Sequence, residues 1–410
     1  MRISLPKFQG DRTIWVMVLF LYIVSLLAVY SSTTTLAYRF RAGNTEYYVV
    51  RHFLIIILGV GLLFLSHNIR YSYYSRLSQI AIYIAVPLLL FTLIRGTVIH
   101  EASRWITLPV INLSFQSSDL ARLALIMYLA RLLTRYRQDI NNLQGSFIPL
   151  AGPVLLVCAL IMPANFSTAA ILFITSLVLM YIGRVRIKYI MGLLGVSIVA
   201  AAVFILILGS MPGGSRVQTW QNRITTFIDK DNSSTYQADH AKIAIATGGI
   251  TGKSPGKSTQ RNYLPQAYSD FIYAIIIEEY GLIGGFFVLL FYLILLYRGI
   301  RIAHKSPGTF GALLAAGLSF SLVFQALINM AVAVNLLPVT GQQLPLVSMG
   351  GTSLWFTSLS IGIILSVSRS TEDEEQLGNN RNDGQDDSPE ANEYNSENEI
   401  IEFTVNTRGN

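Results

Sequence analysis

Long runs of apolar residues, separated by short polar or basic segments, form the main pattern along this chain. Each run is roughly 16 to 25 residues long, and an α-helix of that length can cross the hydrocarbon core of a membrane. The runs lie near residues 13–31, 49–66, 77–95, 117–134, 147–162, 166–183, 188–209, 270–297, 310–334 and 344–367. The pattern predicts an all-α polytopic membrane protein of about ten transmembrane helices.

Composition supports this interpretation. Hydrophobic residues make up 52% of the chain and charged residues only 13%, whereas charged residues form about 25% of a typical soluble domain. The single cysteine, Cys158, lies inside an apolar run. The sequence therefore offers neither a disulfide framework nor a thiolate metal cluster, and we expect no iron–sulfur cluster and no haem.

The orientation of the helices follows from basic residues in alternate short connections. These residues are Arg70, Arg76, Arg131, Arg135, Arg137, Arg184, Arg186, Lys188, Arg298, Arg301 and Lys305. Short loops rich in Lys and Arg remain on the cytoplasmic side. Both termini are then cytoplasmic, with an N-terminal segment 1–12 before the ten-helix membrane domain 13–369.

Two segments differ from this pattern. The connection 210–269, between helices seven and eight, lies on the outer side, and its mixture of apolar and polar residues predicts structure at the membrane surface. The segment 370–410 holds 12 of the 23 acids, so we expect a disordered, acidic cytoplasmic tail. A docking segment near 400–403 is the alternative. The rest of the chain carries 28 basic and 11 acidic residues, 28 − 11 = +17, which suits anionic lipids and phosphates.

Acidic residues in or beside membrane helices are costly and are therefore candidates for function. Asp270 lies where the long outer connection enters an apolar helix, although it could also be a simple helix cap. Glu278 and Glu279 follow at roughly 80° and 180° around the same helix, so Glu278 is the one that could share the face of Asp270. Alternatively, each of the two meets a basic residue or a backbone donor.

Two further candidate groups lie earlier in the chain. Asp119 and Arg122 are three residues apart, hence neighbours on one helix face, and could form an internal ion pair or shape a cavity. Arg104 stands beside Trp105, where it could anchor the chain at the membrane interface or clamp a phosphate.

The outer connection adds cations, among them Arg223, Lys242 and Arg261, and a Gly-rich stretch at 248–258. That stretch lacks the spacing of a phosphate-binding loop and no strand precedes it, so we expect no nucleotide, although another phosphorylated ligand stays open. Pro and Gly also interrupt the segment 337–353. Such a break is a re-entrant turn or lines a polar cavity, which makes Ser348, Gly350 and Gly351 candidate substrate-binding residues.

These stretches resemble the SEDS family (shape, elongation, division, sporulation), the FtsW and RodA group of bacterial peptidoglycan polymerases. The specific matches are Leu264-Pro with Ser269-Asp270-Phe271, Glu278-Glu279-Tyr280-Gly281, and the block from Leu337-Pro to Gly350-Gly351-Thr352-Ser353. Supporting matches are Ala102-Ser-Arg-Trp-Ile, Leu120-Ala-Arg-Leu and Lys242-Ile-Ala-Ile. The wording looks closer to the division member FtsW than to the elongation member RodA.

The chain also departs from the family pattern. Gln266 and Tyr268 stand where the family has Glu and His before the aspartate, Asn165 replaces an aspartate, and Asp119 replaces a glutamate. His240-Ala241 stands where the family has Gln-Ser. Roles of the lost residues do not carry over.

The resemblance implies glycosyl transfer between lipid II molecules at the outer face of the bacterial cytoplasmic (inner) membrane. It implies that Asp270 is the base, or the ligand of a divalent ion such as Mg²⁺ or Mn²⁺. Arg104, Lys242, Arg223 and Arg261 would hold pyrophosphates, while Asp119, Arg122 and Glu278 would shape the cavity.

Implied partners are a class B penicillin-binding protein (a transpeptidase) and other division proteins, with no nucleic acid. The alternatives are a lipid II flippase without glycosyl transfer, an elongation-type polymerase, and a passive scaffold for division proteins.

Overall fold

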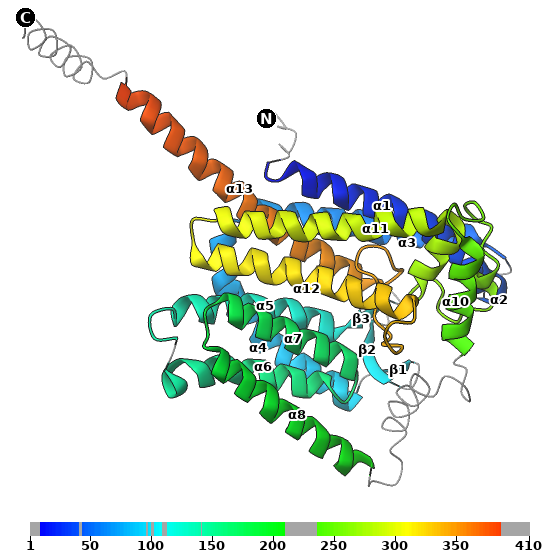
Figure 1. The fold of residues 1–410 in the computed structure, drawn as a ribbon, viewed down its shortest axis with the longest axis horizontal. Helices are drawn as coiled ribbons and strands as arrows, with labels where there is room; N and C mark the ends of the chain where they lie inside the picture. The colour runs from blue at the N-terminus through cyan, green and yellow to red at the C-terminus, as the bar shows by residue number, and fades with distance from the viewer. Residues whose placement is uncertain are drawn as a thin grey trace, which may run out of the picture.

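The computed structural model describes residues 9–40, 43–95, 97–99, 102–108, 113–140, 142–209 and 236–386. Its long helices lie side by side in one bundle (Figure 1). They are α1 (Arg12–Ser32), α3 (Thr45–Asn68), α4 (Tyr71–Arg95), α5 (Ser117–Arg135), α6 (Ile148–Ile161), α7 (Phe166–Ile182), α8 (Ile187–Gly209), α11 (Ile272–Lys305), α12 (Thr309–Ala333) and α13 (Thr352–Asp386). Shorter elements are α2 (Thr34–Phe40), η1 (Leu143–Phe147), α10 (Tyr236–Gly248) and η2 (Gln260–Asn262).

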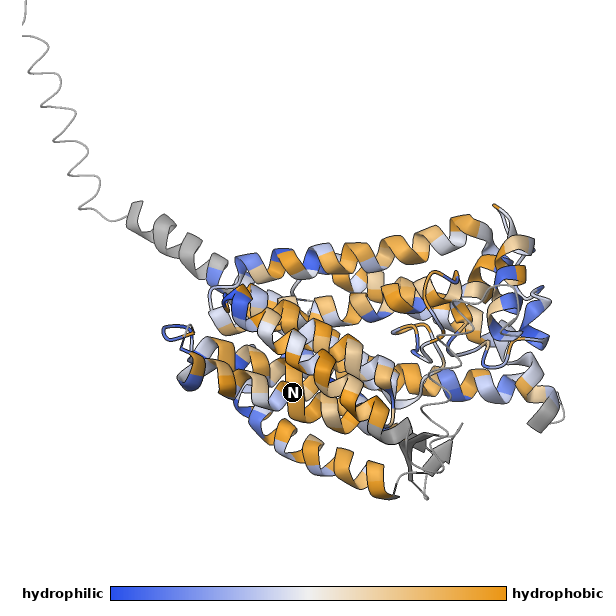
Figure 2. Ribbon diagram, turned by 60° about the horizontal axis from the view of Figure 1, so that its bottom comes forward, coloured by the Kyte–Doolittle hydropathy of each residue, from blue (hydrophilic) through white to orange (hydrophobic). Residues whose placement is uncertain are grey.

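Each apolar run predicted from the sequence overlaps one of the long helices, so the predicted helical membrane fold is confirmed, although residues 344–351 of the last run are not helical. Among the described residues, seven helices are long and apolar enough to cross a membrane. Helices α5, α7 and α13 coincide with the other three predicted spans but are not among these seven. The count of ten therefore remains a prediction. Apolar residues cover the length of the bundle and hydrophilic residues gather at its ends (Figure 2), as a lipid environment requires.

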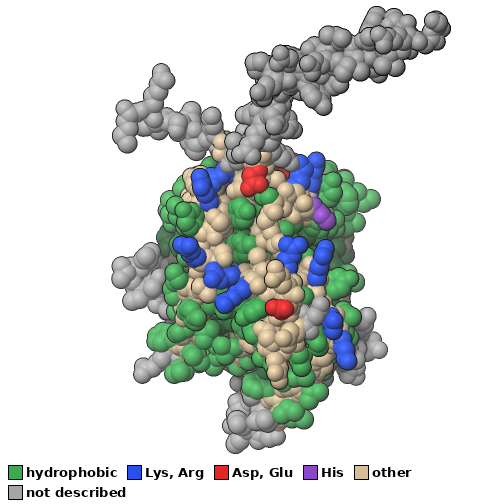
Figure 3. All heavy atoms as spheres, turned by 90° about the vertical axis from the view of Figure 1, so that its left-hand side faces the viewer, with side chains coloured by type: hydrophobic (Ala, Val, Ile, Leu, Met, Phe, Trp, Pro, Cys, Tyr) green, Lys and Arg blue, Asp and Glu red, His purple; other side chains and the backbone are tan. Residues whose placement is uncertain are grey.

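Basic side chains gather at one end of the bundle (Figure 3). Helix α1 begins and helix α13 leaves the bundle at the same end, as predicted (Figure 1). Figure 3 looks at this end and shows Lys and Arg side chains around it. The exposed Arg137 and Arg184 belong to its connections, and the exposed Arg301 lies near the end of α11. The long connection that contains α10 lies at the opposite end, which we call the outer end.

The sequence analysis did not assign a small antiparallel sheet that precedes α5. Strands β1 (Thr97–Ile99), β2 (Ala102–Leu108) and β3 (Leu113–Gln116) lie in the order β1-β2-β3. Trp105 pairs with Gln116, and Leu108 pairs with Leu113. Strands β1 and β2 are rich in β-branched residues, which favour an extended backbone, but they are too short to stand out beside the long apolar runs.

Helix α13 also differs from the prediction. It continues through Asp386, so residues 370–386 are helical, although the sequence analysis placed them in a disordered tail. Good helix formers such as Glu374, Glu375 and Gln376 follow the apolar part of α13, and no proline occurs between its start and Pro389. The rest of the predicted tail, together with residues 1–8 and Arg223, lies outside the described residues.

Helix α11 is broken inside the bundle at Gly281, where φ is +71° and ψ is −174°. Glycine is the residue that adopts this backbone conformation readily. The break frees the carbonyls of Glu278 and Glu279 and the N–H groups of Leu282 and Ile283 from their partners within the helix.

The turn that follows α10 supplies a new hydrogen-bond partner for each of these four groups. Lys253 N and Ser254 N donate to the carbonyls of Glu278 and Glu279, each at 3.0 Å. Leu282 N and Ile283 N donate to the carbonyls of Gly249 and Ile250, at 3.0 and 3.3 Å. Because unsatisfied backbone groups are very costly at membrane depth, this exchange joins the outer connection to α11.

Glycines at the crossing permit this close approach. A Cβ atom on Gly248 would overlap the backbone of Ile277, one on Gly252 would overlap Glu279, and one on Gly281 would overlap Ile250. The Gly-rich stretch and the Glu-Glu-Tyr-Gly motif of the sequence therefore form one structural unit.

Replacing Gly281 by alanine should destabilise the protein by about 1–3 kcal/mol, because the backbone conformation and the contact with Ile250 both exclude a Cβ atom. Thermal unfolding of the purified protein in detergent would measure the loss. Gly195→Ala is the matched control, since a Cβ on Gly195 in α8 would meet nothing within 4 Å. Equal midpoints for the two variants would contradict the role of the break.

Candidate functional site

Asp270 lies in the turn 264–271, directly before α11 and at the outer end of the bundle. Its side chain is partly buried, and Ser269 Oγ donates to Asp270 Oδ1 at 2.9 Å. The backbone is held as well: Asn329 Nδ2, from the buried end of α12, donates to the Asp270 carbonyl at 2.9 Å and to the Gln342 carbonyl at 2.7 Å. One amide therefore joins Asp270 to the segment 334–351.

The segment 334–351, which connects α12 to α13, makes further contacts with the turn that carries Asp270. Ser348 Oγ donates to the Ser269 carbonyl at 2.6 Å, and Met349 N donates to the Tyr268 carbonyl at 3.0 Å. Ser348 Oγ also accepts from Leu344 N at 2.8 Å. Ser348, a predicted substrate-binding residue, thus positions the main chain beside Asp270.

Other polar side chains satisfy the segment 334–351 from the surrounding helices. Gln325 Nε2 of α12 donates to the Gln343 carbonyl at 2.9 Å, and Ser25 Oγ of α1 donates to the Val347 carbonyl at 2.8 Å. The hydroxyl of Tyr292 in α11 donates to the Pro345 carbonyl. Non-helical backbone is stable inside a membrane bundle only with such internal hydrogen-bond partners. The surrounding helices therefore hold this segment in place beside Asp270.

The electrostatics beside Asp270 involve Tyr268. Burial, and after it the negative charge of Asp270, raise the pKa of the Tyr268 phenol. Tyr268 therefore stays protonated at neutral pH and keeps a hydroxyl proton near the carboxylate. It stands where the family pattern has histidine.

Glu278 and Glu279 face the outer connection. Glu278 forms a 2.7 Å ion pair with Lys253 and accepts from Thr259 N at 3.1 Å, Thr259 Oγ1 at 2.8 Å and the Ser258 hydroxyl. Glu279 accepts from Ser31 Oγ and from Ser258 N. These are the contacts of the structural alternative, in which each acid meets a basic residue or backbone donors. Both carboxylates are fully buried anchors of the outer connection.

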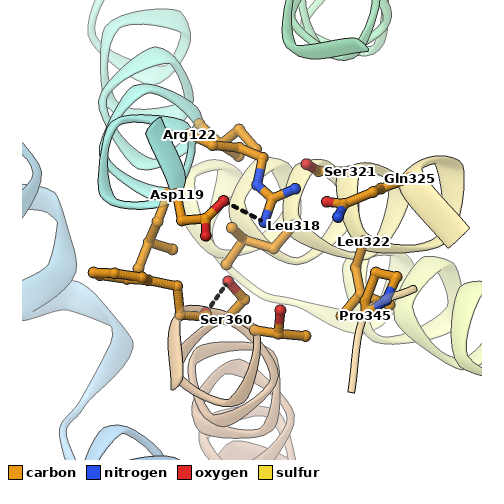
Figure 4. A pocket seen from close by; sticks show the side chains of 12 residues that line it. Asp119, Arg122, Leu318, Ser321, Leu322, Gln325, Pro345 and Ser360 are labelled. Atoms are coloured by element: carbon orange, nitrogen blue, oxygen red, sulfur yellow. Dashed lines mark hydrogen bonds and ion pairs between the residues drawn. The ribbon is translucent and has the colours of Figure 1, made fainter. Parts of the chain in front are cut away.

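Asp119 and Arg122 meet inside the bundle at 3.6 Å. They line a cavity of about 20 Å³ between α5, α12 and α13, together with Gln325, Pro345 and Ser360 (Figure 4). The cavity has room for about one water molecule. The predicted ion pair is thus formed, and it borders the segment 334–351 through Pro345 and Gln325.

The predicted phosphate-binding cations differ in their surroundings. Lys242 on α10 is exposed and lies 3.4 Å from Asp239, whereas Arg261 Nη1 donates to Ser31 Oγ at 3.1 Å. Arg104 lies in strand β2, and its side chain is outside the described part of the structure, as is Arg223. Of the four cations, the described side chains are therefore those of Lys242 and Arg261, both at the outer end.

Gly350 and Gly351 form the turn that leads into α13. Gly351 has a φ of +54°, a backbone conformation that favours glycine. A Cβ on Gly350 would meet the end of the flexible Gln343 side chain.

Sequence reasoning missed the polar side chains that hold the site together, namely Ser25, Thr168, Tyr292, Gln325, Asn329 and Gln342. Gln342 Nε2, for example, donates to Thr168 Oγ1 at 2.7 Å across 174 positions of the chain. The available signal was the presence of isolated amides and hydroxyls inside apolar runs, which usually meet a partner in the bundle.

The arrangement presents one carboxylate, Asp270, on a fixed backbone where the membrane bundle meets its outer surface. Such a carboxylate can accept a proton from a hydroxyl group or bind a cation. Substrates with lipid tails could reach this end of the bundle without leaving the bilayer.

Comparisons with known proteins agree with this architecture. The family model of the FtsW, RodA and SpoVE group, described as "Cell cycle protein", matches residues 11–373. Stage V sporulation protein E of Bacillus subtilis is 32% identical over 373 residues, covering 88% of this chain and 98% of that protein. The probable peptidoglycan glycosyltransferase FtsW of Nitrosococcus halophilus is 32% identical over 343 residues, covering 81% of this chain and 85% of that protein.

Two solved structures share the fold. A chain from a structure titled "Structural coordination of polymerization and crosslinking by a peptidoglycan synthase complex" aligns with a TM-score of 0.69 at 22% identity, over 88% of this chain and 98% of that chain. The rod shape determining protein RodA of Thermus thermophilus aligns with a TM-score of 0.64, also at 22% identity, over 88% and 97%. With its family motifs, the match over residues 11–373 and these relatives, this chain belongs to the FtsW, RodA and SpoVE family of cell cycle proteins, the SEDS family.

Proposed function

We propose that this protein is a peptidoglycan glycosyltransferase that polymerises lipid II at the outer face of the bacterial cytoplasmic (inner) membrane. The observation that carries the proposal is the placement of Asp270: its backbone is fixed by Asn329 and its turn by Ser348. The names of the FtsW relatives, probable peptidoglycan glycosyltransferases, support the same activity.

In the proposed reaction, a sugar hydroxyl of one lipid II molecule attacks the anomeric carbon of another. Asp270 accepts the hydroxyl proton as the new glycosidic C–O bond forms. The bond to the pyrophosphate breaks, and undecaprenyl pyrophosphate leaves with the bonding electron pair. A pyrophosphate is a stable anion and needs positive charge rather than a proton, so one carboxylate suffices, unlike the carboxylate pair of glycosidases.

The cations of the outer end serve that leaving group in this proposal. Lys242 supports the assignment because its ammonium group is exposed. Arg104 and Arg223 are proposed for the same role from the family motif alone. Arg261 donates to Ser31 through Nη1, and its guanidinium has further N–H donors for a phosphate.

Replacing Asp270 by alanine or asparagine should lower the rate of glycan formation by roughly 10²- to 10⁴-fold, because a positioned general base contributes about that much. The measurement uses purified protein in detergent or vesicles with lipid II, and separates the glycan products by length. Glu46→Gln is the matched control, since Glu46 is an exposed acid at the outer end. Normal polymerisation by Asp270→Ala would overturn the assignment.

The same assay separates the alternative functions. A flippase would move lipid II across vesicle membranes and form no glycan with any variant. A passive scaffold would form no glycan either, and Asp270→Ala cells would still divide.

A divalent ion fits the site only with help from the substrate. Among the residues that the structure describes, no group of three or more His, Cys, Asp or Glu could hold a metal. Mg²⁺ often takes one or two carboxylates and completes its shell with phosphate oxygens and water. We propose that Asp270 is the protein ligand of such an ion, Mg²⁺ or Mn²⁺, which would neutralise charge on the pyrophosphate.

Chelation of divalent ions should therefore lower polymerisation, and added Mg²⁺ or Mn²⁺ should restore it. The control is the thermal unfolding midpoint of the protein in the same chelator, which should stay constant because the described residues contain no all-protein metal cage. Full activity in the chelator would leave Asp270 as a base alone.

We further propose that the polymer is made during septal cell division, with a class B penicillin-binding transpeptidase as partner. Relatives named FtsW support the division role, and the synthase complex of the structural neighbour supports the partnership. Depletion of the protein should then give long filaments, and the tagged protein should retrieve such a transpeptidase. Rounded cells after depletion would instead assign the elongation role.

A further inference from the structure

Three aromatic rings lie in contact at the outer end, on the side of the connection that precedes Asp270. Tyr236 and His240 lie one helical turn apart on α10, with ring centroids 4.3 Å apart and planes tilted by 58°. Tyr263, just after η2, lies parallel to His240, with centroids 5.4 Å apart and an angle of 5° between the planes. We call Tyr236, His240 and Tyr263 the outer aromatic stack.

Hydrogen bonds fix the orientation of this stack. His240 Nδ1 and Gln260 Oε1 are 2.7 Å apart. Because an amide oxygen only accepts, Nδ1 is the donor in this contact, and in the neutral ring Nε2 is then an acceptor for an external donor. Gln260 N in turn donates to the buried carboxylate of Glu278 at 3.2 Å. The stack is thus tied through Gln260 to α11.

The outer tyrosines of the stack are open to the surroundings. Tyr236 is 53% exposed and Tyr263 is 54% exposed. Because exposed aromatic rings contribute little to folding, packing alone does not account for them. The polar groups of His240 and Gln260 lie beside these rings, and α10 lies across the end of the bundle (Figure 1). A rigid, open aromatic surface with a polar rim is typical of a binding surface.

The chemistry of the surface matches a sugar ring. A pyranose has faces lined by C–H groups and a rim of hydroxyls. The C–H face can stack on the negative face of a tyrosine ring, while a rim hydroxyl can donate to Nε2 of the neutral His240 ring.

We propose that the outer aromatic stack binds a saccharide unit of the glycan strand beside the Asp270 site. This inference rests on the proposed function and adds a product-binding site to it. Tyr263 precedes Asp270 by only seven residues, and the buried Leu264 and Ala267 pack the intervening turn into the bundle. The distance between stack and carboxylate is therefore fixed by the fold, and a strand held on the stack stays close to the next transfer.

The direct test measures binding of a soluble tetrasaccharide of alternating N-acetylglucosamine and N-acetylmuramic acid to the full-length protein in detergent. Tyr263→Ala and Tyr236→Ala should each weaken binding by about tenfold, the effect of losing one aromatic stacking contact. Tyr263→Phe should bind normally because it keeps the ring. Tyr30→Ala is the matched control: Tyr30, near the outer end of α1, is 56% exposed but lies outside the stack.

The second readout is strand length in the lipid II assay. The two stack variants should release shorter strands than the wild type, whereas Tyr30→Ala should not. Tyrosines at membrane interfaces also act as anchors; in that case all three alanine variants would change stability in vesicles alike, tetrasaccharide binding would be unchanged, and the inference would be overturned.

The two proposals can fail separately. If the wild type makes no glycan from lipid II, the proposed function fails, whatever the tetrasaccharide shows. If the wild type polymerises lipid II but the stack variants match it in tetrasaccharide affinity and strand length, the stack inference fails and the glycosyltransferase stands.

Discussion

The structure depends on one constraint: backbone that leaves the helical conformation inside a membrane bundle must find all its hydrogen-bond partners within the protein. The chain breaks regular helix in two places near the outer end. At Gly281, the turn after α10 supplies a hydrogen-bond partner for each of the four backbone groups that the break exposes. In the segment 334–351, side chains of Ser25, Tyr292 and Gln325 supply the donors.

These two breaks explain why Asp270 is well placed. The turn that carries it lies between them, joined to one by the start of α11 and to the other by Asn329 and Ser348. A carboxylate on a free loop would lose rotational entropy each time it met a substrate, whereas a fixed one has lost it during folding. Under the proposed function, the membrane is the reservoir of a lipid-linked substrate as well as the solvent of the fold.

The sequence predicted the features that depend on local pattern. Apolar runs located the long helices, alternate basic loops placed both termini at one end, and the position of Asp270 beside the outer connection identified the candidate site. Features that depend on distant pairs were not predictable from local pattern. Nothing near Glu278 indicates that Lys253 and Ser258 are its partners, and nothing near Gln342 indicates Thr168. The strands before α5 and the extension of α13 were missed because competing local preferences there differ by little free energy.

The central claim is that lipid II is transformed at the outer end, beside Asp270. A lipid II analogue with a photoreactive group on its sugar would test this claim, with the attachment site on the purified protein located by mass spectrometry. The account predicts attachment within 263–271 and 337–351, reduced by excess unmodified lipid II. Attachment confined to the basic end of the bundle, near Arg137 and Arg301, would contradict it.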